Sequence, residues 1–263
     1  MVDFESKPGY DVYDLNKLMG LLRGMDGCPW DREQTHESIR RNLLEEAYEA
    51  AEAIDDGNAD NLLEELGDVL MQVIFHAGIA EDAGQFNLDD IADATCKKLI
   101  RRHPHVFRDV SARNGEESLL VWEEIKREEK LQETTADAMN SVARSLPALW
   151  RAEKIQKKAA KAGFDWPDYK GALNALHDEL SELDRAIASG GNIEEELGDL
   201  IFSAVNVARF FKIDPEDALG TASEKFISRF ERMENAAHQQ GKRLTGMHLD
   251  EMEAIYQKVK LEE

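Results

Sequence analysis

The sequence has only two cysteines and six prolines among its 263 residues, and it contains no apolar run of 18 residues. Cys28 and Cys96 are too few for a disulfide framework, and no C-x-x-C motif is present. The missing apolar run excludes a transmembrane helix, and the acidic, polar stretch at 1–14 is unlike a signal peptide. We therefore expect a cytoplasmic protein that does not contact a membrane.

Basic residues are also scarce. The chain has 32 Lys and Arg against 54 Asp and Glu, a net charge of −22, so it should repel nucleic-acid backbones and bind no nucleic-acid polymer stably. The motifs G-x-x-x-x-G-K-[ST] and G-x-G-x-x-G are missing, which excludes the P-loop and Rossmann modes of nucleotide binding. A ferritin-like di-iron site needs two E-x-x-H motifs, and only Glu33 to His36 fits.

The apolar pattern is helical. No segment alternates apolar and polar residues as a strand does, whereas residues 62–77 and 193–208 carry apolar side chains at three-and-four spacing. Short polar turns at 55–60 and 188–192 precede these two segments, so each should pair with the preceding helix as an antiparallel neighbour in a bundle. We predict an all-α fold in which Trp30 and Trp166 either anchor the cores or stack on a base.

One sequence unit occurs twice in the chain. "EELGD" occurs at 64–68 and at 195–199, each time after a turn and a partner helix with an acidic pattern. The partner helices are "LLEEAYEAAEAI" at 43–54 and "LHDELSELDRAI" at 176–187, and the basic helices that follow are "CKKLIRRH" at 96–103 and "SEKFISRF" at 223–230. Such internal self-similarity indicates a tandem repeat. We place the joint within 126–145 and the two units at 1–135 and 136–263.

The acids of each repeat have the spacing of a metal site. On a helix, residues three apart share one face, so Glu179 and Glu182 lie together, as do Glu196 and Asp199. The short turn folds one pair against the other, and four converging carboxylates are unfavourable without a cation between them. Hard oxygen ligands suit Mg²⁺ or Mn²⁺. The first repeat offers an equivalent set, which consists of Glu46, Glu49, Glu65 and Asp68.

Two further features accompany the acids. Gly67 and Gly198 lie inside these helices, where glycine costs about 1 kcal/mol relative to alanine, so each indicates either tight helix packing or the close approach of a ligand. The later helices carry Lys98 with Arg102, and Lys225 with Arg229, at four-residue spacing. Such matched cations indicate either surface ion pairs or an anionic substrate whose phosphate charge they offset.

These motifs together resemble the MazG nucleoside triphosphate pyrophosphohydrolases. "EEAYE" followed by "EELGD", and "DELSE" followed by "EELGD", are similar to the EExxE…ExxD pattern of that family. The resemblance to the long bacterial form extends from about residue 13 to the C-terminus and includes "GCPWDREQTHESI" at 27–39, "RRHPHVF" at 101–107, "SLPALWRAEKIQKKAAKAGFDW" at 145–166 and "EKFISRF" at 224–230.

The resemblance implies a fold, an activity and a set of site residues. It implies tandem all-α units that form four-helix bundles in an interlocked homodimer, and Mg²⁺-dependent hydrolysis of nucleoside triphosphates to the monophosphate and pyrophosphate. It assigns the activity to the second unit. The motif match places the catalytic metal ligands at Glu179, Glu182, Glu196 and Asp199, a catalytic and phosphate-binding lysine at Lys225, and further substrate contacts at Arg229, Tyr256 and Lys126.

The sequence departs from the family pattern at three positions. Asp178 stands where the family has Glu, Tyr256 stands where Trp is usual, and Ser223 stands where Asn or Asp is common. Tyr256 keeps an aromatic face for stacking and adds a hydroxyl, which leaves the base preference open. Two other functions stay open: a narrower pyrophosphatase for dUTP or modified nucleotides, and a non-catalytic regulatory protein that binds a nucleotide.

Overall fold

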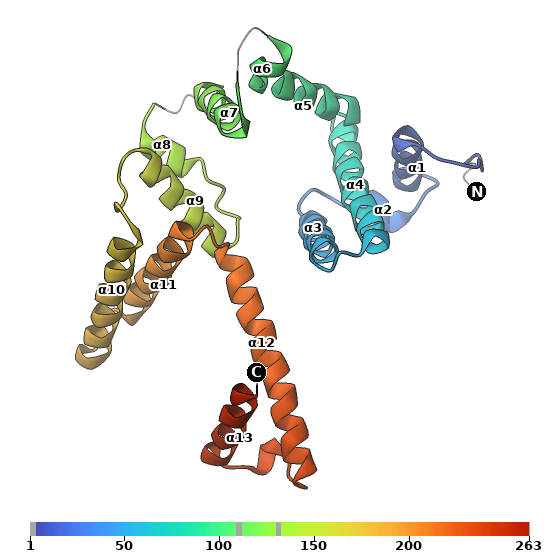
Figure 1. The fold of residues 1–263 in the computed structure, drawn as a ribbon. Helices are drawn as coiled ribbons and strands as arrows, with labels where there is room; N and C mark the ends of the chain where they lie inside the picture. The colour runs from blue at the N-terminus through green and yellow to red at the C-terminus, as the bar shows by residue number, and fades with distance from the viewer. Residues whose placement is uncertain (1–3, 109–111, 130–132, 263) are drawn as a thin grey trace. The chain divides into compact units, whose positions relative to one another are not determined.

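The computed structural model describes residues 4–108, 112–129 and 133–262 (Figure 1). This part of the chain forms thirteen α-helices and one short 3-10 helix, with no strand, which confirms the all-α prediction. It divides into two compact units, 1–126 and 127–263. The predicted division after residue 135 stays a prediction. Within the described residues, no helix combines the length and the apolarity that a bilayer crossing requires.

The first unit is organised around an antiparallel pair of helices, α3 and α4, against which α1 packs. The helices are α1 (Val12–Arg23), α2 (Pro29–Glu33), α3 (Arg40–Asp55), α4 (Ala59–Asp82), α5 (Leu88–Arg102), α6 (Pro104–Phe107) and most of α7 (Gly115–Glu129), which crosses the unit boundary after residue 126. The buried core is small and consists mainly of Met19, Ile39, Ile74 and Phe75. Because these side chains come from α1, α4 and the segment before α3, the core fixes one end of the α3–α4 hairpin.

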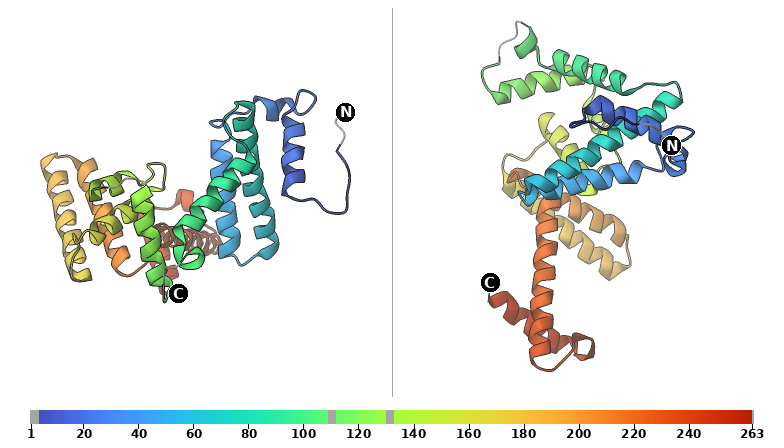
Figure 2. Two further views of the ribbon diagram at one scale, coloured as in Figure 1. Left: turned by 90° about the horizontal axis from the view of Figure 1, so that it is seen from above. Right: turned by 90° about the vertical axis from the view of Figure 1, so that its right-hand side faces the viewer.

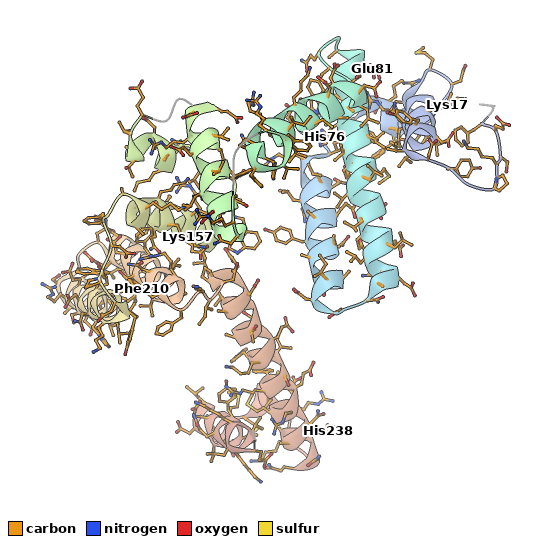
Figure 3. All side chains as sticks on the ribbon, turned by 45° about the horizontal axis from the view of Figure 1, so that its top comes forward. Lys17, His76, Glu81, Lys157, Phe210 and His238 are labelled. Atoms are coloured by element: carbon orange, nitrogen blue, oxygen red, sulfur yellow. The ribbon has the colours of Figure 1, made fainter. Side chains whose placement is uncertain are left out.

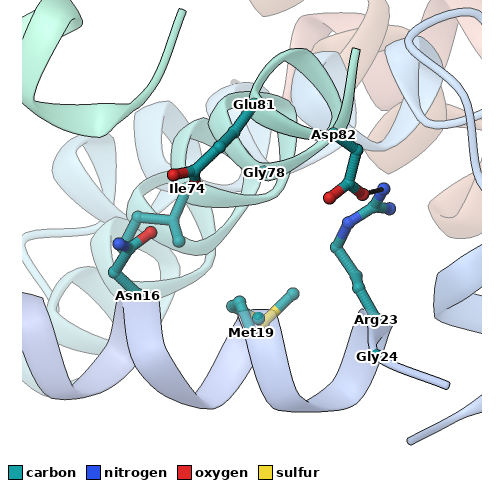
Figure 4. Close-up of a pocket in the computed structure, with 9 residues that line it drawn as sticks. Asn16, Met19, Arg23, Gly24, Ile74, Gly78, Glu81 and Asp82 are labelled. Atoms are coloured by element: carbon teal, nitrogen blue, oxygen red, sulfur yellow. Dashed lines mark hydrogen bonds and ion pairs between the residues drawn. The ribbon is translucent and has the colours of Figure 1, made fainter. Parts of the chain in front are cut away.

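Arg23 ties α1 to α4 within this unit. Its side chain is 7% exposed, donates hydrogen bonds to the Asp31 carbonyl at 2.9 Å and to the Asp82 carboxylate at 2.7 Å, and lies 5.1 Å from the centre of the Phe75 ring. Gly78 leaves the room for it, since a Cβ there would lie 3.4 Å from the Arg23 Nε. The cavity beside Arg23 is about 110 Å³ (Figure 4).

The second unit contains the same kind of hairpin, formed by α10 and α11. Its elements are α8 (Thr135–Asn140), α9 (Ala148–Lys161), α10 (Tyr169–Ser189), α11 (Ile193–Phe210), α12 (Pro215–Gln239), η1 (Leu244–Gly246) and α13 (Leu249–Leu261). Helix α9 packs on α11, where the buried Gln156 donates its side-chain N–H to the Phe202 carbonyl at 2.8 Å. Helix α13 packs on α12 through the buried Met233, Ala237 and Val259.

Both hairpins turn in a similar way, as the repeat predicts. A glycine with positive φ follows the first helix of each hairpin, and its φ is +64° at Gly57 and +72° at Gly190. This backbone conformation favours glycine. An asparagine then caps the next helix, because the Asn58 side chain accepts from the Asn61 N–H and the Asn192 side chain accepts from the Glu195 N–H. The short turns therefore bring the acidic faces of the paired helices together at the turn end of each hairpin.

The two tryptophans expected in the cores lie elsewhere, so that prediction is wrong. Trp30 is 58% exposed and Trp166 is 48% exposed. The Trp166 ring instead covers the first turn of α10, where a Cβ on Gly171 would lie 2.7 Å from it. Both residues lie at or before the start of a helix, and the cores are filled by aliphatic side chains and Phe75.

One ion pair outside the acidic sites should contribute measurably to stability. Arg209 on α11 donates to both oxygens of Asp165 at 2.5 and 2.9 Å, and the two side chains are only 11% and 27% exposed. The Asp165→Asn variant should lower the free energy of unfolding of the second unit by about 1–3 kcal/mol, because it removes a two-bond, charge-assisted contact. Denaturant titration followed by circular dichroism measures the loss.

The same pair should depend on pH. The Arg209 hydrogen bond lowers the pKa of Asp165, so its contribution is complete above the ordinary aspartate pKa and is lost as the pH falls through the lowered value. Glu251→Gln is the matched control, since its 2.8 Å pair with Lys242 is nearly half exposed, so its removal should lower the free energy of unfolding much less than the loss of the Asp165 carboxylate does. Equal losses in the two variants would contradict the assignment.

Candidate functional site

Three carboxylates meet on the α10–α11 hairpin of the second unit. Glu179 lies on α10, while Glu196 and Asp199 lie one turn apart on α11. Each offers an oxygen, and these oxygens all lie within 4.8 Å of one another. Glu179 and Glu196 are half-buried and Asp199 is exposed. The hairpin therefore brings together three of the four ligands predicted from the second repeat.

Glu182, the fourth predicted ligand, lies outside this group of three. Its carboxylate is paired with Arg185 on the same helix at 3.1 Å, and both side chains are largely exposed. Glu182 is nonetheless near enough to Glu179 to act on it electrostatically. Burial is the largest cause that raises the pKa of Glu179, followed by the negative charges of Asp199, Glu182 and Glu196.

The first unit repeats this arrangement on the α3–α4 hairpin. Oxygens of Glu46, Glu49 and Glu65 lie within 4.8 Å of one another, again with two half-buried groups and one exposed group. Asp68 is outside this group of three, but after burial its charge is the next cause that raises the pKa of Glu46. Burial, and then Glu49, raises the pKa of Glu65. Both hairpins thus hold carboxylates close enough to disfavour full ionisation.

The donor set fits a hard divalent cation. All atoms that converge in each cluster are carboxylate oxygens, which Mg²⁺ and Mn²⁺ prefer. Among the described residues, no lysine or arginine forms an ion pair with Glu179, Glu196 or Asp199. A cation of charge +2 would relieve the repulsion that raises the pKa of Glu179. The chemistry of the cluster therefore agrees with the predicted metal site.

Helix α12 carries the predicted basic residues away from these carboxylates. It contacts α9 and α11 and then runs from the corner near Phe210 to the region of His238, beside α13 (Figures 1, 2 and 3). Lys225 lies ten residues after Pro215, the first residue of α12, which is about 15 Å along the axis of that helix. Asp199 lies eleven residues before Phe210, the last residue of α11, which is about 16 Å along the axis of α11. The single chain therefore brings the carboxylates together but leaves Lys225 and Arg229 on a different part of the unit.

The predicted aromatic contact lies with the basic helix. The ring of Tyr256 on α13 is 6.1 Å from the ring of Phe226, the residue next to Lys225 on α12. Lys126 belongs to α7 in the first unit, where its Nζ lies 4.7 Å from the centre of the Trp122 ring. The sequence-based prediction did not single out Trp122, although it is four residues before Lys126.

The mid-helix glycines are not explained by packing within one chain. A Cβ built on Gly67 or on Gly198 would meet no atom within 4 Å, so nothing in the described residues requires glycine at either position. Tight packing between the two helices of a hairpin, one of the two interpretations left open above, is therefore wrong for the single chain. The interpretation that remains is an approach from outside it, by a ligand or by another copy.

Comparison with known proteins agrees with this geometry. The family model described as the MazG nucleotide pyrophosphohydrolase domain matches residues 34–107 and 168–233, one segment in each unit and each including one carboxylate hairpin. A protein of Escherichia coli strain K12 named nucleoside triphosphate pyrophosphohydrolase is 44% identical over 257 residues, which cover 95% of this chain and 98% of that protein.

Two other relatives extend the comparison. A Thermotoga maritima protein named nucleoside triphosphate pyrophosphohydrolase/pyrophosphatase MazG is 42% identical and covers 94% of both chains. The uncharacterized protein YabN of Bacillus subtilis is 44% identical over 254 residues, which are 95% of this chain and 52% of YabN. Both matched segments, the near-complete coverage and the two carboxylate hairpins lead to one conclusion: this chain belongs to the MazG family.

Proposed function

We propose that the protein hydrolyses nucleoside triphosphates to the nucleoside monophosphate and pyrophosphate, with Mg²⁺ as cofactor and Mn²⁺ as a substitute. The observation that carries the proposal is the convergence of Glu179, Glu196 and Asp199 on one hairpin of a MazG chain. The names of the Escherichia coli and Thermotoga maritima relatives support the same activity. The two cysteines are unpaired, which agrees with a cytoplasmic location.

In the proposed mechanism, the carboxylates hold the cation. Glu179, Glu196 and Asp199, with Glu182 completing the set after it leaves Arg185, would hold the cation against the triphosphate. When bound, Mg²⁺ supplies charge neutralisation at the phosphoryl oxygens and lowers the pKa of a water molecule. The water attacks the α-phosphorus, pyrophosphate leaves, and one carboxylate, Glu179 or a neighbour, accepts the proton.

In the proposed mechanism, the basic and aromatic residues contact the phosphates and the base of the substrate. Lys225 and Arg229 offset the charge that develops on the leaving pyrophosphate, and Tyr256 offers a ring on which the base can stack. Lys126 is a further candidate contact to the substrate. These groups would have to lie within a few ångströms of the same bound substrate as the carboxylates.

We further propose that a homodimer assembles the site, with carboxylates from one copy and Lys225 and Arg229 from the other. The support is that α12 leaves the α10–α11 hairpin within one chain (Figure 1). The hairpin also exposes apolar side chains beside the acids, since Leu180, Leu197 and Ile201 are each 45–47% exposed. Covering such a stripe with another hairpin would complete a four-helix bundle and bury apolar surface.

The test is pyrophosphate release from the purified full chain. With Mg²⁺ and a nucleoside triphosphate, the products should be monophosphate and pyrophosphate, and EDTA should reduce the rate to background because the carboxylates alone cannot neutralise the triphosphate. A coupled pyrophosphate assay with product chromatography measures both. Metal-dependent release of orthophosphate, or no metal-dependent release at all, would contradict the proposal.

The same assay separates the two alternative functions. Activity on several bases supports the broad proposal, whereas release from dUTP or from one modified nucleotide alone would identify the narrower enzyme. Nucleotide binding without any product would identify a regulatory protein. A Cβ built on Gly198, beside Asp199, would meet no described atom within 4 Å, so this side of α11 is open to a ligand or to a second hairpin.

A further inference from the structure

Two histidines of the first unit are in direct contact, away from the carboxylate clusters. His36 lies in the segment between α2 and α3, and His76 lies on α4 (Figure 3). Their Nδ1 atoms form a hydrogen bond of 2.8 Å, and their rings are stacked, with centres 5.1 Å apart and planes inclined by 11°. Both side chains are half-buried. The contact therefore joins the segment that leads into α3 to the side of α4.

This hydrogen bond limits the number of protons that the pair can carry. One Nδ1 donates its N–H and the other accepts with a lone pair, so at least one of the two imidazoles must be neutral. When both imidazoles are charged, both Nδ1 atoms carry a proton and two positive charges face each other. The contact is therefore incompatible with full protonation of the pair.

His76 is the ring at which a second proton is least favourable. Its Nε2 is buried and has no hydrogen-bond partner among the described residues. A charged His76 would place a buried N–H donor there without an acceptor, which costs free energy. Burial lowers the pKa of His76, and the charge of His36 lowers it further.

The surroundings of the pair offer no group that would compensate for two charges. Within the described ranges, no carboxylate, thiol or third imidazole has a ligand atom within 4.8 Å of both Nδ1 atoms, which also argues against a metal site there. Glu37 is the neighbouring acid; its own backbone N–H and Thr35 lower its pKa first, and the charge of His36 adds to this. The elements packed on α4 near this contact bring the charged residues Arg23 on α1, Arg40 on α3, and Asp89 and Asp90 on α5. None of these is a cause of the lowered pKa of His76.

We propose that the His36–His76 pair is a pH-sensitive contact, which holds the 34–39 segment against α4 at neutral pH and releases it at mildly acid pH. The segment ends at Ile39, which is 3% exposed and belongs to the core with Met19, Ile74 and Phe75. Its release would uncover apolar surface and open the end of the α3–α4 hairpin that the core fixes. Protons would thereby act on the first unit at a place remote in sequence from its carboxylates.

The direction of the pH effect follows from proton uptake. In the released segment both rings are in water, where the pKa of histidine is about 6.5, whereas the closed form keeps the pKa of His76 lowered. The open form therefore binds more protons between the lowered and the ordinary pKa. Closure is strongest above the ordinary pKa and weakens as the pH falls toward the lowered value, by up to about tenfold in the equilibrium constant for each proton and pH unit.

Hydrogen–deuterium exchange of the full chain tests the proposal. The readout is the protection of the amides of Ile39 and Leu43, which donate to the carbonyls of Thr35 and Ile39 at 3.3 Å each, relative to the intrinsic exchange rate at the same pH. The pH is lowered from about 7.5 to about 5.5, across the ordinary pKa of histidine. Protection in the wild-type chain should fall several-fold, up to about tenfold, while protection on α10 and α11 should not fall.

Variants of the pair separate the contact from its titration. His76→Asn keeps an amide near the position of Nδ1, so it can bond to neutral or charged His36 but takes up no proton, and protection should stay high at both pH values. His36→Ala removes the contact, and protection should be low already at neutral pH. His103→Asn is the control: His103 is an exposed histidine of the same unit whose Nδ1 lies 2.7 Å from the Leu99 carbonyl, and its loss should leave the wild-type pH dependence unchanged.

Three results would each overturn the inference. They are protection of the wild-type amides that does not change with pH, a pH dependence in His76→Asn equal to that of the wild-type chain, and wild-type protection in His36→Ala at neutral pH. If His36→Ala does not fold, the comparison of the wild-type chain with His76→Asn decides the matter. None of these measurements involves nucleotide, so the inference stands or fails separately from the proposed function.

Discussion

Replacing Glu196 and Asp199 together by alanine should reduce pyrophosphate release by about a thousandfold or more, because losing the cation removes several kcal/mol of charge stabilisation. The variant should fold as well as the wild-type chain. Burial, and after it the charges of Asp199, Glu182 and Glu196, raise the pKa of Glu179, so removing Glu196 and Asp199 relieves repulsion and breaks no ion pair. Steady-state rates and far-ultraviolet circular dichroism measure the two expectations.

The matched control changes Glu65 and Asp68 to alanine on the α3–α4 hairpin. Glu65 and Asp68 occupy the same positions of the "EELGD" motif as Glu196 and Asp199, so the two double variants remove the same charges from matching helices. The family resemblance assigns turnover to the second unit, and the control should therefore keep most of the wild-type rate. Full turnover in the Glu196→Ala/Asp199→Ala variant would show that the site is assigned to the wrong hairpin.

Mixing two inactive variants should restore activity if the site lies between two copies. Glu196→Ala/Asp199→Ala removes the cation ligands, and Lys225→Ala/Arg229→Ala removes the phosphate contacts. After the two chains are refolded together in equal amounts, half of the dimers are mixed and each mixed dimer has one intact site of two, so about a quarter of the wild-type rate should return. The effect is large because each parent has almost no activity.

The control for this experiment mixes two variants with the same defect. Glu179→Ala refolded with Glu196→Ala/Asp199→Ala should stay inactive, since every site then lacks a cation ligand. Subunit exchange is verified by labelling the two chains differently and isolating the mixed dimer. If mixed dimers of the complementary pair form but remain inactive, the carboxylates and Lys225 act within one chain, and the arrangement of α12 must change when substrate binds.

Sequence patterns predicted the hairpins, and most of the carboxylates that meet on them, because these features are local. The three-and-four spacing of apolar residues and the short turns at Gly57 and Gly190 are sufficient to pair α3 with α4 and α10 with α11. The spacing rule placed Glu182 beside Glu179 on one face of α10, but it could not show that Arg185, one turn later, would pair with Glu182.

Features that depend on tertiary structure were harder to predict. No local pattern states the direction in which α12 leaves α11, so the separation of Lys225 from the carboxylates could not be read from residue spacing. Trp30 and Trp166 were placed in the cores, but both lie at or before a helix start and are about half exposed.

The confinement of each carboxylate cluster to one hairpin has a consequence for folding. All ligands of a cluster lie within a short stretch of chain, from Glu46 to Asp68 or from Glu179 to Asp199, and one tight turn closes it. The entropy lost in bringing such near neighbours together is small, so these contacts form early and quickly. Under the proposed function, a nascent hairpin would therefore already hold its complete carboxylate cluster during synthesis, before the helices that complete the molecule have been made.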